Sequence, residues 1–208
     1  NDLIASKGSS TFSAITPMGR QHENDREATA ADLKWLADPT EEPEPFGDGG
    51  TKMAWNTFNV VSIYPNGNPV MSDVNQRWVG DCCACAVIAS MAYLYPRFVK
   101  HIIKDNMDKT YTVTMYDPKG KQISVGVGGD YFIGNSGDLG ALGGRNKEVT
   151  WATILEKAMI KWNQIYQGSS NVGGIGTEYV SAIFTGDGES VGFGANALIA
   201  EDLQRAVE

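Results

Sequence analysis

Cysteine, histidine and long apolar runs are scarce in this chain of 208 residues. All three cysteines lie within residues 82–85, and neighbours on one helix rarely form a disulfide, so the sequence predicts no disulfide framework. No apolar run reaches the roughly 18 to 20 residues that a helix needs to cross a bilayer, so we expect no membrane span. Acidic residues outnumber basic ones by 25 to 17, a formal net charge of −8. This balance argues against nucleic acid as a partner, because nucleic acid binds basic surfaces.

The remaining composition is that of a globular protein. Hydrophobic residues make up 42% of the chain and charged residues 20%, which are ordinary proportions. The length is sufficient for a core and for one or two domains. The chain begins with Asn rather than Met, which suggests that a preceding segment was removed. We therefore favour a secreted or cell-surface processed protein.

One segment predicts a nucleophile at the start of a helix, and its sequence is QRWVGDCCACAVIASMAYLY, residues 76–95. Gly80 permits a tight entry turn, and Asp81 can cap the first helical turn. Cys82 then lies at the positive end of the helix dipole, which favours a thiolate, the nucleophilic form of cysteine. Gln76 could donate its side-chain amide to a developing oxyanion. From the cysteines alone, the alternative is a structural helix whose small thiols fill a core.

Three motifs, in order and at suitable spacing, resemble the calpain-like family of papain-fold cysteine peptidases. The first is the segment just described, at 76–90, which matches the family's Gln, Gly-Asp-Cys and Ala-rich helix. The second is TWATILEKAMIKWNQIY at 150–166, similar to the family's Trp-x-x-Leu-Leu-Glu-Lys-Ala-x-x-Lys helix. The third is Phe-Thr-Gly at 184–186. The resemblance covers about residues 73–208, and it departs from the family at Cys83, where a Trp is usual.

The resemblance implies an α+β fold of the papain-like cysteine peptidase type. In these terms the chain carries mainly the helical, nucleophile-bearing subdomain with a β-hairpin, and a β-rich half is missing from it. We divide the chain into an N-terminal extension at 1–52, the nucleophile subdomain at 53–186, and the start of the second subdomain at 187–208. The extension is either a pro-segment that covers the cleft or an ordinary surface linker.

The implied function is that of a cysteine endopeptidase, one chain of a processed calpain-like protease. It would hydrolyse peptide bonds of protein or peptide substrates through a thioester on Cys82, with Gln76 as an oxyanion donor. Two alternatives stay open. One is a non-catalytic relative that binds peptides or has a regulatory role. The other is a papain-fold acyltransferase or amidase that uses the same thiolate.

The chain offers no suitable base for this thiol, although a cysteine peptidase needs a histidine and a group that orients it. His101 lies 19 residues after Cys82, about 28 Å away along a continuous helix. His22 lies in the polar N-terminal arm. In the resembled family the His and the Asn follow the segment that matches the end of this chain. We therefore predict a C-terminal partner chain or segment that carries both residues.

The resembled family's protease core also binds calcium. Asp73 occupies the position of one acidic ligand, nine residues before Cys82, and Glu148 is one place from the other, where this chain has Val149. Calcium takes six to eight oxygen ligands, so the resemblance predicts calcium at Asp73 and Glu148 only with further ligands. A zinc site made of the cysteines and His101 is disfavoured, because consecutive helical positions point about 100° apart.

Periodicity and turn residues predict the secondary structure. Helix-period patterns predict helices at 28–37, 82–95, 97–103, 148–166 and 196–207. Alternating patterns predict a strand at 55–63 and a hairpin of 110–117 with 121–127 around Asp-Pro-Lys-Gly. Glycine or proline content predicts loops or linkers at 39–50, 125–144 and 168–176.

Overall fold

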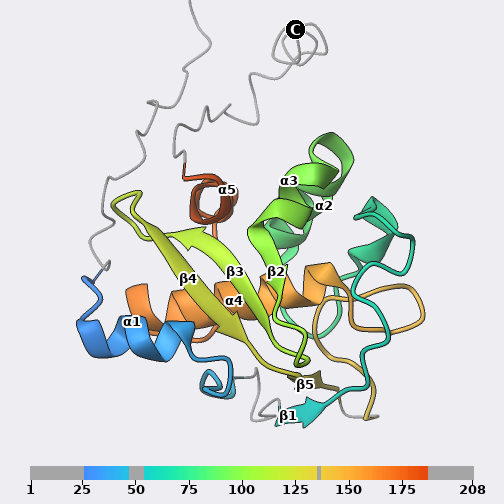
Figure 1. The fold of residues 1–208 in the computed structure, drawn as a ribbon, viewed down its shortest axis with the longest axis horizontal. Coiled ribbons are helices and arrows are strands. Elements are labelled where there is room, and N and C mark those ends of the chain that lie inside the picture. The colour runs from blue at the N-terminus through green and yellow to red at the C-terminus, as the bar shows by residue number, and fades with distance from the viewer. Residues whose placement is uncertain (1–25, 47–53, 135–136, 187–208) are drawn as a thin grey trace, which may run out of the picture.

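The computed structural model describes residues 26–46, 54–134 and 137–186. Within them the chain forms five α-helices, one short 3-10 helix and two small antiparallel sheets. This mixture agrees with the predicted α+β class (Figure 1). The predicted helix at 196–207 lies outside the described residues.

The larger sheet contains the predicted hairpin. Its strand order is β2 (Ile103–Asp105), β3 (Tyr111–Tyr116) and β4 (Gln122–Val127), all antiparallel. Gly120 closes the turn between β3 and β4 with a φ of +78°, and its N–H donates to the Asp117 carbonyl at 2.9 Å. This positive φ is a conformation that glycine adopts without steric cost.

A second, two-stranded sheet pairs β1 (Ala54–Thr57) with β5 (Asp130–Ile133). The predicted strand at 55–63 is therefore much shorter than expected. The prediction that 125–144 is all loop is wrong at β5, because Tyr131 and Phe132 are fully buried there. The Phe132 ring stacks on Trp55 of β1, with 3.7 Å between ring centroids. This long-range packing outweighs the flanking glycines.

The helices follow the predictions closely, with one addition. They are α1 (Ala30–Ala37), α2 (Cys82–Leu94), α3 (Pro96–Ile102), α4 (Trp151–Tyr166) and α5 (Thr177–Thr185), and the 3-10 turn η1 is Met71–Asp73. Thr29 and Asp32 form a capping box at the start of α1, and Pro96 occupies the first turn of α3, where its missing N–H costs nothing. Helix α5 was not predicted, and it ends at Gly186 in the left-handed conformation.

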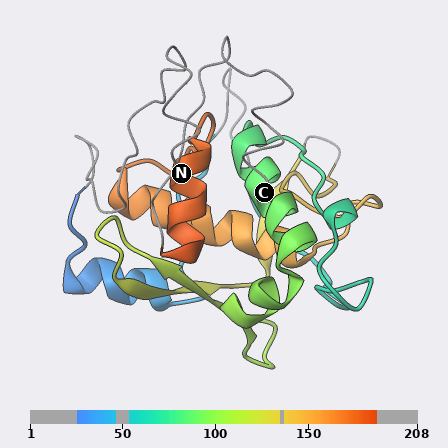
Figure 2. The same ribbon diagram turned by 90° about the horizontal axis from the view of Figure 1, so that it is seen from above.

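Helix α4 is the centre of the core. Fifteen of its sixteen residues are buried, and it packs against β3, β4, α1 and α2. Figures 1 and 2 show α4 running across the larger sheet, with α1 near one end and α2 near the other. Helix α5 packs against α2 and β3. The second family-like motif is therefore the element around which the others assemble.

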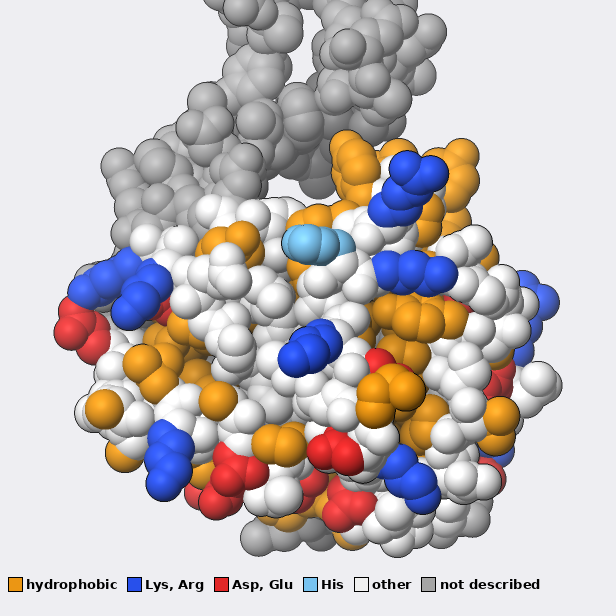
Figure 3. All heavy atoms as spheres, viewed as in Figure 1, with side chains coloured by type: hydrophobic (Ala, Val, Ile, Leu, Met, Phe, Trp, Pro, Cys, Tyr) orange, Lys and Arg blue, Asp and Glu red, His pale blue; other side chains and the backbone are white. Residues whose placement is uncertain are grey.

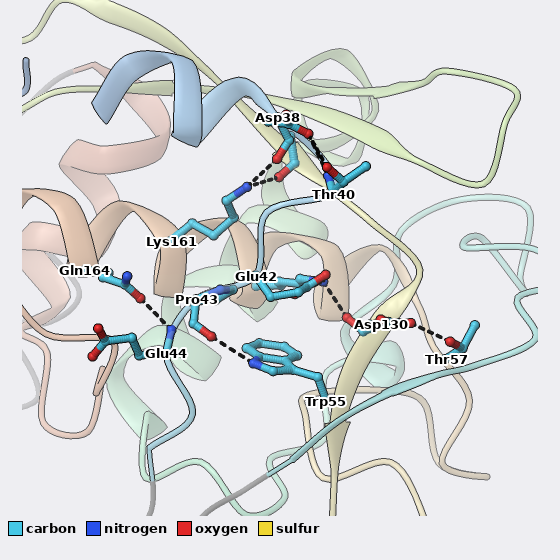
Figure 4. Close-up of polar contacts among 12 residues, drawn as sticks. Asp38, Thr40, Glu42, Pro43, Glu44, Trp55, Thr57, Asp130, Lys161 and Gln164 are labelled. Atoms are coloured by element: carbon cyan, nitrogen blue, oxygen red, sulfur yellow. Dashed lines mark hydrogen bonds and ion pairs between the residues drawn. The ribbon is translucent and has the colours of Figure 1, made fainter. Parts of the chain in front are cut away.

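The described part of the N-terminal extension, residues 26–46, packs on this core. The Lys161 ammonium of α4 donates to the Asp38 carbonyl at 2.7 Å and to the Gly126 carbonyl at 2.9 Å, and Figure 4 shows the contact with Asp38. A Cβ on Gly126 would lie 2.4 Å from the Ala37 carbonyl oxygen. Glycine at this position therefore lets the extension pass directly against β4.

Candidate active site

Cys82 is the first residue of α2 and is exposed. This position matches the prediction for a nucleophile at a helix N-terminus. The expected capping by Asp81 is wrong, because Asp81 occupies the N-cap but its side chain makes no capping hydrogen bond. Asp81 is only 1% exposed, and its carboxylate instead accepts a hydrogen bond from the Cys85 thiol at 3.5 Å. A second buried carboxyl group, that of Glu156, lies next to it.

The three thiols have different environments. Cys82 is exposed, whereas Cys83 and Cys85 are partly buried. Burial, and next the negative charges of Asp81 and Glu156, raise the pKa of the Cys85 thiol far above its usual range. Because the thiolate is the reactive form, Cys85 is a poor nucleophile.

Gln76 lies on the loop that leads into α2, and its side chain is exposed. Its amide nitrogen donates to the Val79 carbonyl at 2.9 Å, not to Cys82. An amide nitrogen carries two hydrogens, so one remains for a substrate oxyanion. The loop is held by an antiparallel bridge between Asn75 and Gly143 and by the Trp78 N–H, which donates to the Gly140 carbonyl at 3.0 Å.

Asp81 and Glu156 form a buried carboxyl pair beneath the start of α2. Each side chain is 1% exposed, and the two carboxyl groups are within hydrogen-bonding reach. Burial raises the pKa of Asp81 to about 6. Burial, and next the charge of Asp81, raise the pKa of Glu156 well above its usual range. In the sequence Glu156 is part of a family-like motif, and an acid within the apolar stripe of 150–166 is a visible signal of a buried partner.

Asp73, a predicted calcium ligand, is buried and already fully hydrogen-bonded. Its carboxylate accepts from the Asn66 amide at 2.9 Å, the Val70 N–H at 3.3 Å and the Trp151 indole at 2.7 Å. One carboxylate oxygen of Glu148 is buried without a partner in the described part of the chain. No group of three or more His, Cys, Asp or Glu side chains suited to a metal occurs among the described residues. Calcium binding therefore stays a prediction.

His101 is exposed on α3, and α3 is bent by 112° from α2. His22 lies outside the described residues. No helix in the described part is by itself long and apolar enough to cross a membrane, and α2 and α3 meet that test of length and composition only as this bent pair.

An apolar groove of about 460 Å³ lies between α2 and α5, and Phe98 of α3 also lines it. Its lining includes Ala86, Ser90, Leu94, Phe98, Ser181 and Thr185. Cys82, Ala86 and Ser90 are exposed on successive turns of α2, so they share one helix face. Helix α2 has no charged side chain. Figure 3 shows hydrophobic side chains gathered over the α2–α3 end of the molecule.

Comparison with known proteins adds no assignment. No protein-family model matches the chain, and no curated protein matches it either.

Proposed function

We propose that this chain is the nucleophile-bearing half of a calpain-like cysteine endopeptidase. The observation that carries the proposal is the exposure of Cys82 at the first position of α2, with the Gln76 loop fixed just upstream. The other two thiols lie deeper, and Cys85 is held in its protonated form. The three family-like motifs support the same reading.

The proposed reaction uses two groups of this chain. The Cys82 sulfur would form a bond to the scissile carbonyl carbon, while the Cys82 backbone N–H and the Gln76 amide hydrogen-bond the oxyanion. The thiol proton would pass through a histidine of the partner to the leaving amine as the C–N bond breaks. Water would then hydrolyse the thioester, release the acid product and return a proton to the sulfur.

The exposed face of α2 supports the proposal of a partner that supplies His and Asn. Tyr93, Leu94 and Tyr95 are 73%, 59% and 63% exposed at the end of this helix. Leu94 and Tyr95 also line the apolar groove, which lies along the same helix as Cys82. Exposed apolar patches of this kind mark interaction sites. A partner that covers the groove would reach the helix that carries the nucleophile.

The experiment combines activity-based labelling with a cleavage assay. The chain would be produced alone and together with a candidate partner, namely any coding sequence that follows residue 208 in its gene. Each sample would be treated with a peptidyl epoxide and with an unstructured protein substrate. We expect cleavage only with a partner, and loss of both cleavage and labelling in Cys82→Ala. Cys83→Ala is the matched control and should keep both.

Other outcomes separate the alternatives. A thioester on Cys82 that turns over only with an added amine acceptor would favour an acyltransferase. Absence of labelling in a folded complex would favour a peptide-binding or regulatory relative.

A further inference from the structure

The buried pair beneath α2 connects both sides of the proposed oxyanion site. Glu156 accepts a hydrogen bond from the Leu142 backbone N–H at 2.9 Å. Thr153, one turn earlier on α4, donates its hydroxyl to the Leu142 carbonyl. Helix α4 therefore holds both backbone groups of Leu142 with two of its own side chains.

Leu142 belongs to the loop that holds Gln76. Asn75 and Gly143 exchange two backbone hydrogen bonds, and the Trp78 N–H donates to the Gly140 carbonyl. Glu156 thus contacts the Gln76 side of the site through Leu142. It contacts the Cys82 side through Asp81, the N-cap of α2.

The two carboxyl groups need a proton between them. Asp81 Oδ2 and Glu156 Oε1 are buried and have no hydrogen-bond partner among the described residues when both groups are ionised. A single shared proton satisfies both oxygens, whereas two adjacent buried carboxylates repel each other. Among the described residues, the only other titratable group that acts on the pair is the Cys85 thiol of α2, and no basic side chain shifts the pKa of either acid.

We propose that Glu156 is a positioning residue, which in its protonated form donates to Asp81 while accepting from Leu142, and so keeps the start of α2 and the Gln76 loop in one arrangement. The inference rests on the proposed roles of Cys82 and Gln76. Protonated, Glu156 links the two sides. Ionised, it repels Asp81, and the first turn of α2 loses its support.

The sign of the pH effect follows from the raised pKa values of both acids. From about pH 6, Asp81 is ionised and Glu156 still carries the shared proton. As pH rises through the pKa of Glu156, that proton is lost. The first turn of α2 should then be less ordered, so that Cys82 is held less firmly at the helix N-terminus.

The test measures the rate of Cys82 alkylation by iodoacetamide between pH 5.5 and 9.5 on the full chain, with mass spectrometry to resolve the three thiols. This readout needs no peptidase activity. Wild type should depart from a single-thiol titration curve at alkaline pH. Glu156→Gln keeps a neutral hydrogen-bond donor. Near pH 6.5 its Cys82 should be alkylated within about twofold of the wild-type rate, and at alkaline pH its rate should show no departure from the single-thiol curve. Glu156→Ala should react about threefold to tenfold more slowly at the same pH.

Glu44→Gln is the matched control, because Glu44 is exposed on the extension, and its profile should equal that of wild type. Backbone exchange at Leu142 gives a second measure that does not depend on the thiol. The Leu142 amide hydrogen should exchange slowly in wild type and in Glu156→Gln, and faster in Glu156→Ala.

The proposal is overturned if Glu156→Gln keeps the alkaline departure, or if Glu156→Ala folds with unchanged alkylation and unchanged exchange at Leu142. If these signatures appear but the chain with its partner cleaves no peptide, the proposed function fails and the positioning role of Glu156 stands.

Discussion

Trp151 donates its indole N–H to the Asp73 carboxylate at 2.7 Å, although 78 positions separate them in the sequence. The contact joins the first residue of α4 to the turn that precedes the Gln76 loop. Thr150 adds a hydrogen bond from its hydroxyl to the Asp73 carbonyl at 3.2 Å. The residue that the family resemblance placed in a calcium site thus has a structural role that needs no ion.

The first prediction concerns this role of Asp73. Asp73→Ala should lower the free energy of unfolding by about 1–3 kcal/mol, because the buried Trp151 indole loses its acceptor. Urea unfolding of both proteins, with and without calcium, would measure this loss of unfolding free energy. We expect the same loss in both conditions. A loss seen only with calcium present would show instead that Asp73 binds the ion.

The second prediction is that Cys82 alone reacts with thiol reagents near neutral pH. Cys82 is exposed, whereas burial and the nearby carboxylates keep Cys85 protonated. Peptide mapping after brief iodoacetamide treatment should place the adduct on Cys82. Cys82→Ser should remain unmodified under the same conditions. An adduct on Cys83 with Cys82 unmodified would contradict the assignment of the nucleophile.

The third prediction is that Gln76 contributes to turnover and not to stability. Gln76→Ala in the complex with its partner should lower kcat by about 10²–10³, the usual effect of losing one oxyanion donor. Its melting temperature should stay close to that of wild type, because the side chain is exposed. Gln122→Ala, at an exposed position of β4, is the control and should keep full activity. A fully active Gln76→Ala enzyme would refute the role.

The elements that the sequence predicts well are those that depend on local signals. The break between α2 and α3 follows from Pro96, which cannot continue a helix. The hairpin follows from alternation in 110–127 and from the glycine that closes its turn. Helix α4 follows from its apolar period. The position of Cys82 at the start of α2 was also predicted from the preceding Gly-Asp.

The features that the sequence did not predict depend on distant partners. Strand β5 forms because Phe132 stacks on Trp55 of β1, which no local pattern contains. Asp81 was expected to cap α2, but its carboxyl group is buried and accepts from the Cys85 thiol instead, next to Glu156 of α4. A capping rule considers only residues close in the sequence, so it does not predict a contact with a distant residue such as Glu156.

The fourth prediction is that the Asp81–Glu156 pair makes stability fall as pH rises. Both folded-state pKa values are raised, that of Asp81 to about 6 and that of Glu156 further, whereas the unfolded values lie near 4. Above about pH 4 the folded state therefore binds more protons than the unfolded state. The free energy of unfolding should decrease as pH rises from about 4 through 6 and beyond.

The double variant Asp81→Asn, Glu156→Gln should remove this dependence. Between pH 4.5 and 7.5 wild type should lose unfolding free energy relative to this variant, about 2 kcal/mol from Asp81 alone and a further amount from Glu156. Urea titrations at the two pH values measure the difference. Parallel pH profiles for the two proteins would show that the acids do not share a proton in the folded chain.

The fifth prediction is that residues 26–46, the described part of the extension, belong to the stable fold through the pair of Glu42 and Lys157. The Lys157 side chain is 2% exposed, and its ammonium lies 2.6 Å from the Glu42 carboxylate. It also lies 4.8 Å from the centroid of the Trp55 ring. Figure 4 shows neighbouring contacts of the same segment, including the Trp55 indole bonded to the Pro43 carbonyl.

Glu42→Ala should therefore cost about 3 kcal/mol of unfolding free energy, because it leaves a buried ammonium without its counter-charge. Glu41→Ala, at the exposed neighbouring position, is the matched control and should change stability by less than about 0.5 kcal/mol. Residues 26–46 should also become more sensitive to limited proteolysis in Glu42→Ala. Adding Lys157→Met to Glu42→Ala should restore much of the loss, because it removes the unpaired charge while keeping an apolar side chain against Trp55. If Glu42→Ala and Glu41→Ala unfold at the same urea concentration, the extension contributes no stability through this pair and is only a surface segment.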